Sequence, residues 1–492
     1  MKIFISLFII LFTSNLLAKT TLNILPKPQV SNVDINTKID INSIQQWVLF
    51  SKSFPQIAQH FNDFFQQENL TLVDAKNSNI QLKQQIIVLL KNNKLLDEEY
   101  LIHIDQDIVI EAATQKGAYY ALQSFKQLLM NDQLYKLEIQ DFPTQSWRGN
   151  MIDVARHFRS KEYIKRHIEL MGHYKLNRLH LHLSDDQGFR IEIKAFSKLT
   201  DISGNTSVYN DPAGFYSQAD ILELVSFANS HHVMIIPEID LPAHTRSITH
   251  AYPNLACLND DTQKYSGTHV LKTKLCLQKM DQVLPFLLTI FDEIMPLFDS
   301  KFVHIGADEV VLTKGLEAEE TMLLHNLYQT LITHINQNNK TVIAWEEILN
   351  FNLKGDFIAQ LWSGKSEFLT QARHSKTPII LSLCKHAYFD HGYYNGHPKM
   401  ATWCNKDGVT LQNAFEMPFY SDLNILGLES ALWGELVRTD QRADLRLWPR
   451  LFATAESSWT DSTKLEFNDF KNRVNLQLPF LKTMNVDYFS DY

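Results

Sequence analysis

The chain has 492 residues, of which 45% are hydrophobic and 21% charged. That length and composition are typical of a globular protein with a sizeable core and more than one domain. It carries 46 Lys and Arg against 55 Asp and Glu, for a formal net charge of -9. A net negative charge argues against a nucleic-acid partner, because phosphate binding needs a basic surface.

The first residues are predicted to be an export signal. Lys2 is followed by an apolar run over residues 3–12, and Leu16-Leu17-Ala18 offers a small residue at a cleavage point. The run is shorter than the ~20 residues that span a bilayer. We therefore expect residues 1–18 to be removed and the protein to be periplasmic or extracellular with no stable membrane span. An uncleaved anchor is the alternative.

Residues 19–142 are predicted to form a small α+β domain. Strand-like runs at 86–90 and 107–112 are followed by apolar residues at helical spacing over 117–130. Asp141-Phe142-Pro143 then interrupts the pattern, because proline restricts the residue before it and ends regular structure. We place the domain boundary there.

From residue 143 to 492, strand and helix patterns alternate, which favours a parallel sheet covered by helices. The fold class is therefore α/β, and eight strands predict a closed (β/α)8 TIM barrel, with an open doubly wound sheet as the alternative. The predicted strands are 148–154, 178–184, 233–239, 302–307, 342–345, 357–362, 379–383 and 425–432. Polar and aromatic residues gather at their carboxyl ends, where barrel enzymes place their active sites.

The most informative of these ends carries Asp308 and Glu309, two adjacent acids after the strand 302–307. Alternation along a strand puts His304, Gly306 and Asp308 on one face, and the small Gly306 leaves room beside them. An isolated acid pair more often caps a helix. At the end of a barrel strand, with other polar residues nearby, the pair predicts acid–base chemistry.

Four cysteines fall into two close pairs, Cys257 with Cys276 and Cys384 with Cys404. In an exported protein each pair could close a surface loop as a disulfide, with free buried thiols as the alternative. None of them lies in a C-x-x-C arrangement, so a cysteine metal site is less favoured.

Five segments in order resemble the hexosaminidases of glycoside hydrolase family 20. They are W-R-G-N-M-I-D-V-A-R-H-F at 147–158, H-L-H-L-S-D-D-Q-G-F-R at 180–190, P-E-I-D-L-P-A-H-T at 237–245, H-I-G-A-D-E-V at 304–310 and A-L-W-G-E at 431–435. The segment G-A-Y-Y-A-L-Q-S-F-K-Q-L-L at 117–129 is similar to the helix that precedes the barrel in that family.

The resemblance implies an exo-acting, retaining β-N-acetylhexosaminidase that needs no cofactor and no metal and acts on a carbohydrate substrate. The substrate's own 2-acetamido oxygen would be the nucleophile, an exception among glycosidases. It implies Glu309 as general acid and base, and Asp308 as the carboxylate that orients the acetamido N–H. His244 and Asp185 would form a relay behind the acid, and Tyr388 would bond the acetamido oxygen. We expect Glu309 to stay protonated near neutral pH, because a neighbouring carboxylate holds its proton more tightly.

The resemblance also implies a sugar-binding surface. Tryptophan provides flat apolar faces for sugar rings, and charged groups make strong hydrogen bonds to hydroxyls. The implied residues are Trp433 as the floor, Trp345 and Trp362 as walls of the acetamido pocket, Arg148, Asp390 and Glu435 as partners of ring hydroxyls, and Trp403 stacking on the next sugar. Terminal N-acetylglucosamine is the expected substrate, with N-acetylgalactosamine as an alternative.

Two residues depart from the family pattern, Ala307 and Ala243, each where glycine is usual. We expect little effect at Ala307, and strain of roughly 1 kcal/mol at Ala243 if that position requires a positive φ. The polar strand residues are expected to form a buried hydrogen-bond network; they are His180, His182, Glu238, Asp240 and His304.

Two other functions are considered. His180-Leu181-His182 with His244 and Asp308 could belong to a metal-dependent amidohydrolase, but there the H-x-H pair lies on the first barrel strand, whereas here a complete strand precedes it. A non-catalytic sugar-binding protein would keep the tryptophans but would not need both acids.

Overall fold

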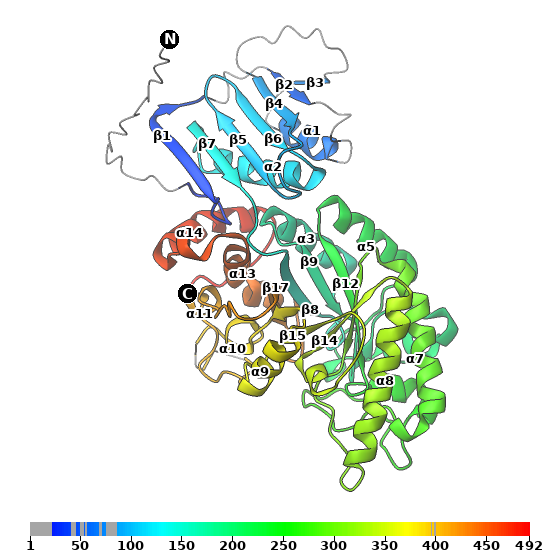
Figure 1. The fold of residues 1–492 in the computed structure, drawn as a ribbon. Helices are drawn as coiled ribbons and strands as arrows, with labels where there is room; N and C mark the ends of the chain where they lie inside the picture. The colour runs from blue at the N-terminus through cyan, green and yellow to red at the C-terminus, as the bar shows by residue number, and fades with distance from the viewer. Residues whose placement is uncertain are drawn as a thin grey trace, which may run out of the picture.

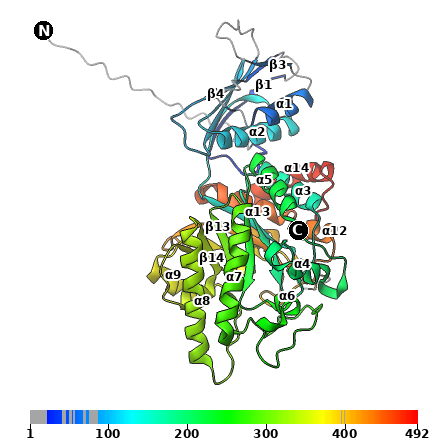
Figure 2. The same ribbon diagram turned by 90° about the vertical axis from the view of Figure 1, so that its right-hand side faces the viewer.

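The computed structural model describes residues 22–40, 46–49, 54, 57–67, 71–74, 86–394, 396–397 and 400–492. The predicted signal at 1–18 lies outside these residues. The described chain forms a small N-terminal domain and a larger barrel domain, and both views show the N-terminal domain beside α3, α5 and α14 of the barrel domain (Figures 1 and 2).

The N-terminal domain is a seven-stranded sheet with two helices. The strand order is β1-β7-β5-β6-β4-β2-β3. The strands are β1 (Val30–Lys38), β2 (Gln46–Leu49), β3 (Thr71–Asp74), β4 (Ile86–Lys91), β5 (Tyr100–Ile104), β6 (Ile108–Ala112) and β7 (Tyr135–Asp141), and the helices are α1 (Ala58–Gln67) and α2 (Gln115–Met130). Helix α2 begins where Thr114 caps it, because the Thr114 hydroxyl accepts from the Gly117 N–H at 3.3 Å.

The second domain is a closed barrel of eight parallel strands, so the predicted fold class is confirmed and the open sheet is wrong. The strands are β8 (Trp147–Asp153), β9 (Arg178–His182), β12 (Met234–Leu241), β13 (Phe302–Gly306), β14 (Thr341–Trp345), β15 (Phe357–Leu361), β16 (Ile379–Leu381) and β17 (Ile425–Leu432). Each overlaps a strand expected from the sequence. Two short strands, β10 (Ser184–Asp185) and β11 (Gly188–Phe189), form a separate hairpin.

Helices surround the barrel and bury their apolar faces against it. They are α3 (Lys161–His173), α4 (Lys198–Asp201), α5 (Gln218–Ser230), α6 (Arg246–Ala251), α7 (Met280–Ile294), α8 (Glu317–Gln337), α9 (Ser366–Ser375), α10 (Cys384–Ala387), α11 (Leu411–Phe415), α12 (Asp440–Leu447), α13 (Arg450–Trp459) and α14 (Phe467–Thr483). Helix α5 starts with a capping box, in which Ser217 and Asp220 satisfy each other's backbone N–H groups. Over the described residues, every helix is too short or too polar to cross a membrane.

The barrel interior holds the expected buried polar network. Glu238 accepts from the Trp345 indole N–H at 3.0 Å, and it also contacts His180, His182 and His304, the last at 2.9 Å. Asp240 differs from the expectation, because neither of its carboxylate oxygens has a hydrogen-bond partner among the described residues. Burial, followed by the charge of Asp308, raises the pKa of Asp240 well above its ordinary value.

The two domains meet at the amino-terminal end of β8, around buried charges. The Lys175 ammonium lies 2.9 Å from Asp141, and both side chains are fully buried. Asp141 also accepts from the Trp459 indole at 2.8 Å. The charges of Lys175 and Asp141 are therefore buried as a pair, and neither is left without a partner.

Candidate active site

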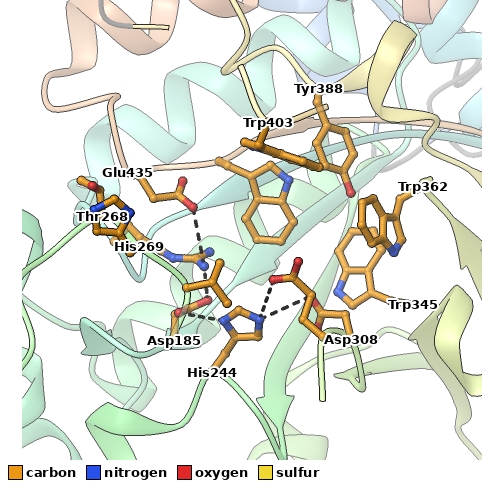
Figure 3. Close-up of a pocket in the computed structure, with 14 residues that line it drawn as sticks. Asp185, His244, Thr268, His269, Asp308, Trp345, Trp362, Tyr388, Trp403 and Glu435 are labelled. Atoms are coloured by element: carbon orange, nitrogen blue, oxygen red, sulfur yellow. Dashed lines mark ion pairs between the residues drawn. The ribbon is translucent and has the colours of Figure 1, made fainter. Parts of the chain in front are cut away.

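A cavity of about 340 Å³ opens at the carboxyl ends of the barrel strands (Figure 3). It is lined by Arg156, Asp185, His244, Thr268, His269, Val270, Asp308, Glu309, Trp345, Trp362, Tyr388, Trp403, Trp433 and Glu435. The structure therefore brings together all the predicted site residues except Arg148 and Asp390.

Asp308 and Glu309 follow β13 directly, on a backbone that turns through unusual conformations. Gly306, Ala307 and Glu309 have φ values of 69°, 75° and 53°. Gly306 cannot be replaced without movement, since a Cβ there would lie 1.7 Å from Oδ1 of Asp240. The strained turn directs Asp308 into the cavity while Glu309 stays partly exposed.

The two family departures behave differently from the expectation. The positive φ falls on Ala307, where little effect was expected, whereas Ala243 is not among the residues with positive φ. The neighbouring His244 has the positive φ instead, at 54°. A non-glycine residue in this region costs roughly 1 kcal/mol, so the strain lies in the acid motif itself.

His244 lies between the acids and Asp185, as the predicted relay requires. Its Nε2 is 3.4 Å from Glu309 Oε2 and 3.6 Å from Asp308 Oδ2, and its Nδ1 is 3.4 Å from Asp185 Oδ1. Burial alone would lower the pKa of His244, but the charges of Asp185 and Asp308 outweigh it and raise that pKa well above its ordinary value. His244 is therefore a cation beside both acids.

The order of proton affinity in the acid pair is the reverse of the one expected. Burial raises the pKa of Asp308 to about 6. A hydrogen bond from His244 lowers the pKa of Glu309, whose side chain is 39% exposed. The expectation that Glu309 stays protonated near neutral pH is therefore wrong for the empty site, because a histidine cation and solvent favour its charged form.

A second charged cluster lies at the other side of the cavity, around Arg156. Its guanidinium is 2.8 Å from Asp185, 3.1 Å from Asp153 and 3.7 Å from Glu435. Burial raises the pKa of Glu435 to about 7. The pKa of Asp390, a buried residue just outside the lining, also rises to about 7 because of burial. The Arg156 guanidinium can donate hydrogen bonds to hydroxyl groups, and the carboxyls of Glu435 and Asp390 can accept hydrogen bonds from them.

Aromatic side chains form the remaining walls. Trp345 and Trp433 have ring centroids 5.7 Å apart, and Trp362 lies 6.5 Å from Tyr388 and 5.7 Å from Trp403. Figure 3 shows Trp345 and Trp362 across the cavity from Asp185, with Asp308 between. Burial raises the pKa of Tyr388 well above its ordinary value, so its hydroxyl keeps its proton.

Both cysteine pairs are disulfides, and each anchors a segment that borders the cavity. Cys257–Cys276 closes the loop that contributes Thr268, His269 and Val270, and Cys384–Cys404 joins α10 to the residue after Trp403. Sequence reasoning missed the three loop residues. Their position between two paired cysteines was the available signal.

The prediction that Arg148 binds sugar hydroxyls is wrong. Arg148 is fully buried at the amino-terminal end of β8, where its guanidinium meets Glu98 at 2.9 Å and bonds the carbonyls of Lys175 and Gln145, each at 2.8 Å. Arg156, eight positions further along the same motif, faces the cavity instead. The signal was available, since Arg148 is the first residue of the predicted strand 148–154 and therefore lies far from its carboxyl end.

The H-x-H pair belongs to the buried polar network of the barrel. His180 and His182 lie on β9, the second barrel strand, as the sequence indicated. Every ring nitrogen of the pair faces a carboxylate of Glu238, Glu429 or Asp185. These carboxylates outweigh burial and raise the pKa of His180 to about 9 and that of His182 well above its ordinary value, so both are protonated.

A barrel whose carboxyl end joins a pair of carboxylates to a tryptophan-walled cavity is the arrangement expected of a glycoside hydrolase. Comparison with protein families agrees and is more specific. Residues 145–462 match the model of glycosyl hydrolase family 20, catalytic domain, and residues 21–142 match glycosyl hydrolase family 20, domain 2. The chain belongs to glycosyl hydrolase family 20.

Curated relatives include a beta-hexosaminidase of Porphyromonas gingivalis, 31% identical over 80% of this chain and 55% of its own length. A beta-N-acetylhexosaminidase of Cellulomonas fimi is 30% identical over 78% of each chain. The chain thus spans little more than half of the first relative and most of the second.

Solved structures show the same architecture. The family 20 beta-N-acetylhexosaminidase of Streptomyces coelicolor A3(2) superposes with a TM-score of 0.85 at 25% identity, covering 96% of this chain and 98% of that one. The family 20 exo beta-N-acetylglucosaminidase of Vibrio harveyi, solved in complex with N-acetylglucosamine, gives 0.83 at 27% identity, covering 97% and 80%.

Proposed function

We propose that this protein is an exo-acting, retaining β-N-acetylhexosaminidase that removes terminal N-acetylglucosamine by substrate-assisted catalysis. The single observation that carries the proposal is the placement of Asp308 and Glu309, side by side, in a cavity walled by Trp345 and Trp362. The names of the relatives support the same activity. N-acetylgalactosamine is a second substrate of the same chemistry.

The terminal sugar would lie with one ring face on Trp433 and its acetamido group between Trp345 and Trp362. Apolar C–H faces of a pyranose favour such flat surfaces. The Tyr388 hydroxyl, which keeps its proton, would donate to the acetamido oxygen. Arg156 and Glu435 would bind ring hydroxyls through charge-assisted hydrogen bonds.

In the first step the acetamido oxygen attacks the anomeric carbon while Glu309 donates a proton to the leaving glycosidic oxygen. The bond from the anomeric carbon to that oxygen breaks, and a cyclic oxazolinium forms, whose positive charge Asp308 stabilises. Glu309 then removes a proton from water, which attacks the anomeric carbon and reopens the ring. Two displacements at one carbon retain its configuration.

This sequence requires the pair's proton on Glu309 and the charge on Asp308, whereas the pKa shifts of the protein alone make Asp308 the acid with the higher proton affinity. Both arrangements hold one proton, so the net charge is the same. A bound acetamido N–H that donates to Asp308 favours its anion, and a leaving group that covers Glu309 removes it from solvent. Substrate binding therefore moves the proton to the acid that needs it.

The test is hydrolysis of an aryl N-acetyl-β-glucosaminide by two variants. Glu309→Gln and Asp308→Asn should each lower kcat/KM by roughly 100- to 10,000-fold, because each removes the group that moves the proton or meets the charge. The matched control is Glu367→Ala, an exposed glutamate on α9, which should retain full activity. Full activity of either site variant contradicts the assignment.

We also propose that the protein is exported. The apolar residues 3–12 support this, as do the two disulfides, because such bonds persist in oxidising compartments. Fractionation of the native host with detection of the chain tests it, and a chain starting near Lys19 in the exported fraction is the expected result.

A further inference from the structure

The two tryptophans that wall the acetamido pocket are held in different ways. The Trp345 indole N–H donates to Glu238 at 3.0 Å, inside the barrel network. The Trp362 indole N–H donates to Oε2 of Glu347 at 3.2 Å, outside that network. Trp345 is almost fully buried, whereas Trp362 is partly exposed. The position of the Trp362 ring thus depends more on its hydrogen bond to Glu347 than the position of the Trp345 ring does on its bond to Glu238.

The segment that supplies this acceptor follows Trp345 directly. Glu346 and Glu347 open the 3-10 turn η8 (Glu346–Asn350) at the end of β14. Glu346 accepts from the backbone N–H groups of Trp362 and Ser363 at 2.9 and 3.2 Å. Adjacent glutamates therefore hold the backbone and the side chain of one tryptophan, and they connect the loop after β15 to the end of β14.

The Trp362 indole also lies against aromatic rings. Its rings meet Tyr388, nearly parallel at 6.5 Å, and Trp403, edge-on at 5.7 Å. Both are apolar contacts without strong directionality. Among the described residues, the bond to Glu347 is the one directional contact of the indole N–H.

We propose that Glu347 is a positioning residue that fixes the Trp362 wall and thereby sets the largest N-acyl group the pocket accepts. The proposal rests on the proposed function, since it concerns the pocket for the acetamido group. Glu347 does not line the cavity, so it acts through Trp362.

Glu347 performs this role as a neutral carboxyl group. Burial, and then the charges of Asp308 and Glu346, raise the pKa of Glu347 to about 8. A neutral carboxyl still accepts the indole hydrogen bond through its oxygen, and it adds no second anion near Asp308. Glutamine, of similar shape and without charge, should therefore replace it.

The test compares kcat/KM for aryl N-acetyl-, N-propionyl- and N-butyryl-β-glucosaminides. Glu347→Ala should lower the preference for N-acetyl over N-butyryl by at least ~5-fold, mainly through a higher KM for the N-acetyl substrate. Glu347→Gln should keep both the preference and kcat/KM within ~2-fold of wild type. Glu367→Ala on α9 is the matched control and should change neither. If Glu347→Ala does not fold, Glu347→Asp replaces it, with the same direction expected because its carboxyl is one methylene further away.

The proposal is overturned if Glu347→Ala, or Glu347→Asp in its place, keeps the wild-type preference for the N-acetyl over the N-butyryl substrate. It is also overturned if Glu347→Gln loses that preference as Glu347→Ala does. A wild-type protein inactive on all three substrates would instead overturn the proposed function. Changed activity without a changed acyl preference would show that Glu347 only supports the fold, which also overturns the proposal.

Discussion

Two arginines of one sequence motif lie at opposite ends of β8 and show what distinguishes the two ends of the barrel. Arg148, at the amino-terminal end, is fully buried and bonds two carbonyls, a tyrosine and a glutamate. Arg156, beyond the carboxyl end, meets three carboxylates and faces the cavity. Arg148 therefore stabilises the fold, whereas Arg156 lines the cavity where a ligand would bind.

The same contrast extends to the acids. Asp141, at the domain junction, bonds Lys175, Trp459 and the Gln29 N–H, so its charge is fully compensated. At the carboxyl end, Asp240 and Oδ1 of Asp308 have no hydrogen-bond partner among the described residues, and the backbone at Ala307 is strained. These unpaired groups and this strained turn lie where a substrate is expected to complete the site.

We expect the largest effect from replacing the two arginines, with a loss of activity at Arg156 and a loss of stability at Arg148. Arg156→Met should lower kcat/KM for an aryl N-acetyl-β-glucosaminide by ~100-fold or more, because a charged partner of a ring hydroxyl is lost. Arg148→Met should instead destabilise the fold by about 3–5 kcal/mol, since a buried ion pair loses one member. Urea denaturation and steady-state kinetics on each variant measure both quantities.

The structural role of Arg148 would be contradicted if Arg148→Met kept wild-type stability and lost activity. Normal kinetics of the folded Arg148→Met fraction would support it.

A second expected effect concerns the pH profile of kcat/KM. The free enzyme is active when the acid pair holds one proton, so the profile should be bell-shaped. Activity should fall as pH rises through about 6, where Asp308 gives up the pair's proton. It should also fall at low pH, below the ordinary value of about 4.3 for a glutamate, where lowered-pKa Glu309 takes a second proton. An activity that keeps rising above pH 7 contradicts this assignment.

The smallest expected effect concerns backbone strain. Ala307→Gly should stabilise the protein by up to ~1 kcal/mol, less the entropy that glycine adds to the unfolded chain, because φ is 75° there. Ala243→Gly is the matched control, and it should destabilise by roughly 0.5–1 kcal/mol, because φ is not positive there. Thermal unfolding of the two variants measures the difference, and equal shifts would show that Ala307 stores no strain.

The sequence predicted the architecture well because barrel strands are continuous apolar runs with polar ends. All eight strands overlap their predicted ranges, and α2 begins two residues before its predicted start. Asp308, Glu309, His244 and Asp185 meet because carboxyl ends of parallel strands share one rim.

The site features that the sequence did not predict depend on distances between residues that are far apart in the chain. Arg148 is an exception, because the predicted strand 148–154 already put it at the amino-terminal end and only the family resemblance placed it at the site. The proton location depends on the nearness of His244 to Glu309 and on solvent at Glu309. The loop residues Thr268 to Val270 carry no strand or helix pattern that would have placed them.

The central claim is that the substrate's acetamido group supplies the nucleophile between Asp308 and the tryptophan walls. The most direct measurement compares kcat/KM for an aryl 2-acetamido-2-deoxy-β-glucoside with the matching β-glucoside that bears a 2-hydroxyl. The account predicts a preference of at least ~1,000-fold for the acetamido substrate, because an intramolecular nucleophile is lost with that group. Comparable rates for the two glycosides would contradict it.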